Sequence, residues 1–130
     1  MNAALEFHDS EVERITFVDG LLSVLFSEAY IHQSEGEPGV DPGNGYLQAI
    51  DLVFTEAKIL GSIESYGDLS DGSVVMDGIN FQLIPVPFKA TGSISAQLVF
   101  KDGSVISLSA RSIACQPIGP AKWLESYPGA

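Results

Sequence analysis

Four Asp-Gly dipeptides punctuate this chain, and each lies between runs rich in β-branched and aromatic residues. They begin at Asp19, Asp71, Asp77 and Asp102. Asp-Gly readily adopts the positive φ angles of tight hairpin turns, so between apolar runs it is a strong hairpin signal. None of the four fits the D-x-[DN]-x-[DN]-G pattern of a calcium-binding loop. Turns between antiparallel strands are therefore expected at all four.

The turn at Asp102-Gly103 can be typed from the apolar residues on either side of it. A two-residue turn would place the two apolar sets on opposite faces of the hairpin, because a one-residue slip reverses every side chain. We therefore predict a three-residue turn, Lys101 to Gly103, with Gly103 left-handed in a G1 bulge. This register pairs Leu98 with Ile106, Ala96 with Leu108 and Ile94 with Ala110.

The first hairpin favours the shorter connection. A two-residue Asp19-Gly20 turn of type I′ aligns apolar partners across the two strands, whereas a three-residue turn would match Ile15 with Ser23. The predicted register pairs Phe17 with Leu22, Ile15 with Val24 and Glu13 with Phe26.

Further strands are expected over Tyr46–Leu60, Ser73–Met76 and Ile79–Ile84. Pro85 and Pro87 follow, and since proline cannot donate to a strand ladder, this segment is an edge, a bulge or a crossing between sheets. No helical periodicity of ten residues or more is present, and no linker divides the chain. The expected fold is a single all-β domain over residues 1–130. It has about eight mostly antiparallel strands in a meander, as a sandwich or a small barrel.

The charge balance excludes several classes of protein. The chain has 17 acidic and 6 basic residues, a net charge of −11, yet 45% of its residues are hydrophobic, which is too apolar for a disordered acidic tail. The basic residues are scattered singly, so neither nucleic acid nor an anionic membrane surface is an expected partner. There is no stretch typical of a secretory signal or a membrane span. One cysteine and no disulfide framework indicate a reducing cytoplasm.

The segment Gln33–Gly45 is the one connection that is not a tight turn. It contains four glycines, two prolines and four polar candidates for ligand binding: Glu35, Glu37, Asp41 and Asn44. A loop of this length is often a binding loop or a lid. The alternatives are a mobile, solvated acidic loop, an ordered binding loop and a specific cation site.

The strand that leads into this loop carries three more candidate ligand-binding residues, Glu28, Tyr30 and His32. They share a parity and are expected to continue the apolar row of Leu22, Val24 and Phe26, since strand side chains alternate. Tyr, His and Glu at the mouth of an apolar interior are typical of a ligand site. Half-buried residues whose polar tips reach water or a backbone carbonyl are the alternative.

His8-Asp9-Ser10 resembles a contiguous catalytic triad, but in an extended strand His8 and Ser10 face away from Asp9. A structural role is expected instead, with Asp9 or Ser10 bonded to backbone groups before the first hairpin. A metal site needs three or four converging ligands, and the chain has only two histidines, His8 and His32. No catalytic residue, metal or cofactor is predicted.

Two remaining features suggest structural roles. Cys115 lies in an apolar stretch and is expected to be a small buried hydrophobic side chain. Trp123 and Tyr127 lie in a tail that is either an exposed anchor for a partner or a segment that docks on its own domain and covers a sheet edge.

Residues 5–12, Leu-Glu-Phe-His-Asp-Ser-Glu-Val, followed by a hairpin, resemble the start of small bacterial β-rich proteins. Some of these are encoded near polymorphic toxins and are regarded as immunity proteins. The resemblance covers about 25 residues around the F-H-D-S motif, implies a bacterial protein with an interaction role, and transfers no catalytic residue.

Two functions follow as hypotheses. The first is a non-enzymatic domain that binds a protein partner, in its sharpest form an inhibitor or immunity protein for a basic enzyme, since opposite charge accelerates encounter. The second is a small-molecule-binding barrel or cupped sheet with its mouth at Tyr30, His32 and the 33–45 loop. A homodimer through an edge strand is compatible with both.

Overall fold

The computed structural model describes residues 1–130 and contains ten β-strands and no helix. The all-β prediction is confirmed, and no helix is therefore available to cross a membrane. The strands are β1 (Asn2–Val18), β2 (Leu21–Ser34), β3 (Gly43–Thr55), β4 (Lys58–Leu60), β5 (Gly67–Met76), β6 (Ile79–Phe81), β7 (Leu83–Pro85), β8 (Phe88–Phe100), β9 (Val105–Pro117) and β10 (Lys122–Tyr127).

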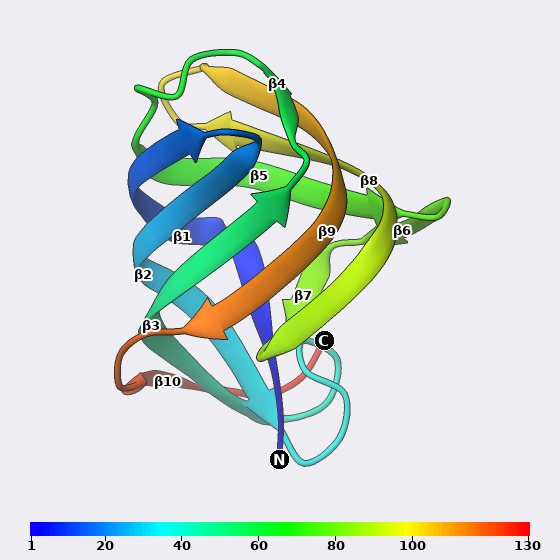
Figure 1. Ribbon diagram of the computed structural model, residues 1–130. Helices are drawn as coiled ribbons and strands as arrows, with labels where there is room; N and C mark the ends of the chain where they lie inside the picture. Colours follow the sequence, from blue (N-terminus) through cyan, green and yellow to red (C-terminus); the bar gives the residue numbers. More distant parts are fainter.

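Six long strands close into an antiparallel barrel (Figure 1). Their order is β3-β2-β1-β5-β8-β9, and β9 returns to pair with β3 from Ile50↔Pro117 to Thr55↔Ser112. β4 pairs with the first part of β9, beyond the end of β3, while β6 pairs with β5 and β7 pairs with the first part of β1. Figure 1 shows both chain ends and the β2–β3 loop toward the same end of the barrel.

The barrel interior is filled by side chains. Inward-pointing residues of the six strands, together with Ala57 and Ile84, form one cluster of 25 buried residues, including Phe7, Phe26, Phe54 and Phe100. A barrel of this few strands encloses only enough space for its own side chains. Any ligand or partner must therefore bind on the outside of the barrel or at its ends.

Three of the four predicted Asp-Gly turns are confirmed. Asp19-Gly20 and Asp77-Gly78 are two-residue turns with positive φ at both positions, as type I′ requires. The turn at Lys101–Gly103 has three residues: Gly103 has a φ of 93°, and its N–H donates to the carbonyl of Phe100 at 3.0 Å. All three predicted pairs of this hairpin are present.

The prediction of a turn at Asp71-Gly72 is wrong, because both residues lie within β5, paired with Val99 and Leu98. Here glycine is needed for close approach rather than for a turn. A Cβ on Gly72 would stand 2.7 Å from Cγ of Phe7, whose ring crosses the strand inside the barrel.

Strand boundaries differ from the prediction where the backbone bends. The single strand expected over Tyr46–Leu60 ends at Thr55, because Glu56 has a φ of 50° and redirects the chain into β4. The strand expected over Ile79–Ile84 is divided into β6 and β7. The proline segment that follows is a crossing, in which the chain leaves β1 and joins β9 through β8.

The C-terminal tail docks on the body of the domain, as one of the two interpretations of the sequence expected. β10 pairs with the first part of β3, from Gly43 to Leu47, where β9 no longer does. Its opposite edge has no strand partner, and Trp123 remains 60% exposed.

Candidate functional site

A large bulge in β1 gives the site its shape. Glu6 pairs with Tyr30 and Glu11 with Glu28, so four residues of β1, Phe7–Ser10, stand opposite a single residue of β2. Phe7 enters the interior, while Asp9 takes a φ of 69° and remains exposed. The bulge thus re-aims the side chains of the F-H-D-S motif.

Ser10 closes this bulge. Its buried hydroxyl donates to the carbonyl of Glu6 at 2.5 Å and accepts from the backbone N–H of Tyr30 at 2.9 Å. The structural role predicted for Ser10 is confirmed. Glu13 does not pair with Phe26 as predicted, because a separate one-residue bulge leaves Glu13 without a partner between Arg14↔Leu25 and Val12↔Phe26.

A second bulge, in β2, reverses which side chains face outward. Phe26 pairs with Ile50 of β3 and Ala29 with Gln48, so Ser27 and Glu28 stand opposite one residue. The interior row therefore passes from Phe26 to Ala29 and Ile31, which are fully buried. The prediction that Tyr30 and His32 continue the interior row is wrong, because the extra residue turns both of them to the outer face.

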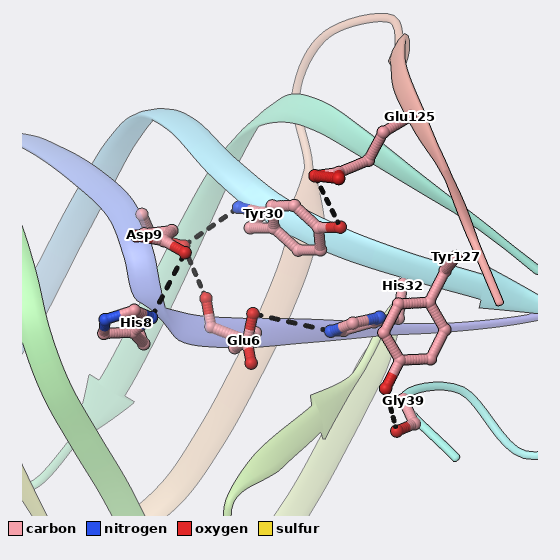
Figure 2. A network of polar contacts seen from close by, with 9 residues as sticks. Glu6, His8, Asp9, Tyr30, His32, Gly39, Glu125 and Tyr127 are labelled. Atoms are coloured by element: carbon pink, nitrogen blue, oxygen red, sulfur yellow. Dashed lines mark hydrogen bonds and ion pairs between the residues drawn. The ribbon is translucent and has the colours of Figure 1, made fainter. Parts of the chain in front are cut away.

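On that outer face Tyr30 and His32 lie in an open hollow of about 460 Å³ (Figure 2). We call it the acidic hollow. Its lining residues are Glu6, Asp9, Tyr30, His32, Gly39, Leu83, Glu125 and Tyr127. Three of the eight are carboxylates and none is a lysine or arginine.

Tyr30 occupies the centre of the acidic hollow. Its hydroxyl donates to Oε1 of Glu125 on β10 at 3.3 Å, across 95 positions of the sequence. The hydroxyl lies over Gly45, where any Cβ would collide with it. Burial, followed by the Glu125 carboxylate, raises the pKa of Tyr30 to about 12. Tyr30 is therefore a neutral donor throughout the physiological range.

His32 is 5% exposed and lines the hollow beside Glu6, with 3.4 Å between its Nε2 and Oε2 of Glu6. The rings of Tyr30 and Tyr127 meet the imidazole edge-on from either side, each with ring centroids 4.9 Å away. The Tyr127 hydroxyl donates to the carbonyl of Gly39 at 2.8 Å. Nδ1 of His32 has no hydrogen-bond partner, which is uncommon for a buried polar atom.

Of the seven site residues predicted from the sequence, the structure brings Tyr30 and His32 together in the acidic hollow. Glu28 is exposed and lines a different, smaller hollow with Gln48 and Lys122. Asn44 belongs to β3, and its side-chain oxygen accepts from Nε1 of Trp123 at 3.1 Å.

The remaining three, Glu35, Glu37 and Asp41, lie in the loop between β2 and β3. This loop spans residues 35–42 rather than the predicted 33–45, because both strands extend further than expected. It is ordered by its own hydrogen bonds: the Glu37 N–H donates to Oδ2 of Asp41 at 2.7 Å, and the Asp41 N–H donates to the Glu37 carbonyl at 2.9 Å. The carboxylate of Asp41 is thus engaged by the loop backbone.

A second, more apolar hollow of about 480 Å³ adjoins the first. It is lined by Met1, Asn2, Ala3, Ala4, Glu37, Pro38, Leu83, Pro85, Val86 and Pro87. The two hollows share Leu83, and the loop contributes Pro38 to one and Gly39 to the other. Together they form one surface with an apolar part and an acidic part.

The other chemical candidates lie apart from this surface or have simple partners. Nδ1 of His8 lies 3.2 Å from Oδ2 of Asp9, and both side chains are more than half exposed. No group of three or more His, Cys, Asp or Glu side chains is arranged to hold a metal ion. Cys115 is a free, fully buried thiol, as predicted, and burial raises its pKa to about 12.

The sequence interpretation missed Glu6, Asp9, Leu83 and Glu125 as parts of the site. Glu125 carried a signal, because it stands between Trp123 and Tyr127 with the same parity in the tail. Placing it at Tyr30, however, required knowing that β10 pairs with β3.

Comparison of the chain with protein-family models, with curated proteins and with solved structures gave no match.

Proposed function

We propose that this protein is a non-enzymatic binding domain whose partner is a basic protein, and that the acidic hollow is the centre of its contact surface. An inhibitor or immunity protein for a basic enzyme is the sharpest form of the proposal. The observation that carries it is the meeting of Glu6, Asp9 and Glu125 in a hollow that holds no lysine or arginine.

Charge supports a protein partner of opposite sign. The whole chain has a net charge of −11, so its field attracts a basic partner over a distance, and the hollow adds three carboxylates to that field. Such complementarity mainly increases the association rate and selects among partners.

The adjoining apolar hollow supports a macromolecule over a free cation. Protein interfaces combine an apolar centre with polar groups, and tyrosines are enriched in them. Here Tyr30 and Tyr127 stand on the acidic side, while Pro85, Val86 and Pro87 stand on the apolar side. A partner could cover both parts with one segment.

A small ligand is the second candidate, and the unpartnered Nδ1 of His32 favours it, because a ligand with an N–H or O–H group could satisfy that atom. Because side chains fill the barrel interior, the proposed ligand site is the acidic hollow on the outer face and not the mouth of the barrel. The proposed compartment for either function is the cytoplasm, in keeping with the single cysteine.

The test uses purified protein as bait at low and high salt, with bound proteins identified by mass spectrometry and the complex then rebuilt from purified components. We expect a basic protein that binds in one-to-one ratio and whose affinity falls as salt rises. The double variant Glu6→Gln/Glu125→Gln should weaken binding about tenfold or more through the loss of two charge-assisted contacts.

The matched control is Glu13→Gln/Glu64→Gln, which removes the same two negative charges from exposed positions outside both hollows. It should bind nearly as well as the wild type. Equal weakening by both double variants would show a non-specific charge effect, and a partner that is acidic or indifferent to salt would refute the proposal.

A further inference from the structure

Three carboxylates reach the acidic hollow from different directions. Glu6 immediately precedes the β1 bulge, Asp9 lies within it, and Glu125 comes from β10. Figure 2 shows them spaced around the Tyr30 ring rather than gathered at one point. A ligand that hydrogen-bonds to all three carboxylates must therefore carry hydrogen-bond donors that point in several directions.

His32 adds an acceptor that is already desolvated. Nε2 lies 3.4 Å from Oε2 of Glu6, and in the neutral imidazole with its proton on that nitrogen, Nδ1 is a hydrogen-bond acceptor. This atom is buried and has no partner, although the imidazole lines the hollow. An N–H donor on a ligand would give Nδ1 of His32 the hydrogen-bond partner that it lacks.

The ring of Tyr127 covers one side of the His32 imidazole. It packs edge-on against the imidazole, its hydroxyl donates to the carbonyl of Gly39, and its backbone pairs with Gly43 of β3. β10 is exposed along most of its length and has a strand partner on one edge only. Rotation of this ring would open the His32 edge and offer a flat aromatic face for stacking.

Several acceptors in different directions, beside aromatic rings, match a guanidinium group better than an ammonium. Guanidinium is planar, carries five N–H donors in a fixed fork and stacks on tyrosine, whereas ammonium is a compact, strongly hydrated charge with three donors. We infer that the acidic hollow binds an arginine side chain, with Glu6 and Glu125 as its main carboxylate partners and His32 Nδ1 as a further acceptor. This inference rests on the proposed function, since the arginine would belong to the basic partner.

The test is an amide NMR titration of the full-length protein with N-acetyl-arginine amide. Saturable shifts are expected at Glu6, Asp9, Tyr30, His32 and Glu125, with an affinity in the millimolar range for one isolated side chain. N-acetyl-citrulline amide keeps the shape of arginine without its charge, and it should bind at least about tenfold more weakly. N-acetyl-lysine amide should bind several-fold more weakly than the arginine probe.

Variants separate the roles of the site residues. Glu6→Gln and Glu125→Gln should each reduce arginine binding several-fold, while Glu64→Gln, on a distant loop, should leave it unchanged. His32→Phe keeps a buried ring without its nitrogens and should weaken arginine binding while the amide spectrum shows an intact fold. Unchanged arginine binding in His32→Phe would remove His32 from the site.

Three results would overturn the inference: no saturable shift in the hollow, equal binding of citrulline and arginine, or lysine binding as tight as arginine. None of these would refute a basic partner whose capture is lost in the Glu6→Gln/Glu125→Gln variant. Conversely, saturable arginine binding together with an acidic or salt-indifferent partner would refute the proposed function and leave the arginine site in place.

Discussion

The backbone N–H of Tyr30 donates a 2.9 Å hydrogen bond to the hydroxyl of Ser10, which lies in the bulge of the neighbouring strand. The same hydroxyl donates to the carbonyl of Glu6. One buried serine therefore fixes the bulge that presents Asp9 and holds the strand that presents Tyr30. The outer face of the barrel depends on this contact for its shape.

Ser10→Ala should lower the free energy of unfolding by about 1–3 kcal/mol, because it leaves two backbone groups without their partner in a buried position. Urea denaturation of the variant and the wild type measures the difference. Ser70→Ala is the matched control: Ser70 is exposed and bonds to the Val99 carbonyl at 3.3 Å. A loss no larger than that of the control would contradict a structural role for Ser10.

Gly72→Ala should also be destabilising, by about 1–3 kcal/mol, because its Cβ would stand 2.7 Å from the buried ring of Phe7. Thermal unfolding followed by circular dichroism tests this. Gly119→Ala places its Cβ 3.5 Å from Cβ of Ala49, an ordinary contact, and should change stability little. If the two alanine variants unfold alike, glycine is not required by close approach at position 72.

Cys115 should resist thiol reagents in the native protein. Its burial raises the pKa to about 12, so almost no thiolate is present below pH 9, and no path leads to the sulfur without local opening. We expect the reaction in native buffer to be slower than in denaturant by on the order of a hundredfold or more. Rapid labelling of the native protein would show that β9 opens readily around this residue.

Tyr30 should ionise two pH units later than an ordinary tyrosine, since burial and Glu125 raise its pKa from 10.0 to about 12. The folded pKa is above the unfolded one, so the stability linked to this group is intact below pH 10 and decreases as the pH rises toward 12. The difference in phenolate absorbance between the wild type and Tyr30→Phe measures this titration.

Glu125→Gln provides the control for the cause of the shift. Because burial is the larger cause and Glu125 the second, the variant should lower the Tyr30 midpoint only in part. A midpoint near 10 in the wild type would show that the phenol is not held in the hollow as described.

Much of the local structure could be predicted because it depends on neighbouring residues. Alternating apolar side chains define strands, and the register on either side of Asp102-Gly103 follows from pairing those side chains on one face. The same reasoning failed at Asp71-Gly72, because a glycine needed for contact with Phe7 has the same sequence signature as one needed for a turn.

The amino-acid sequence by itself determined an all-β chain, its principal hairpins, the buried state of Cys115 and the excess of negative charge. Tertiary structure decided where that charge could act. A bulge in β2 turned Tyr30 and His32 from the interior to the outer face, and a bulge in β1 placed Asp9 in the same hollow. Pairing of β10 with β3 then brought Glu125 and Tyr127 to them. Bulges and long-range pairing reflect the packing of the whole barrel, so no local pattern of residues could place this site.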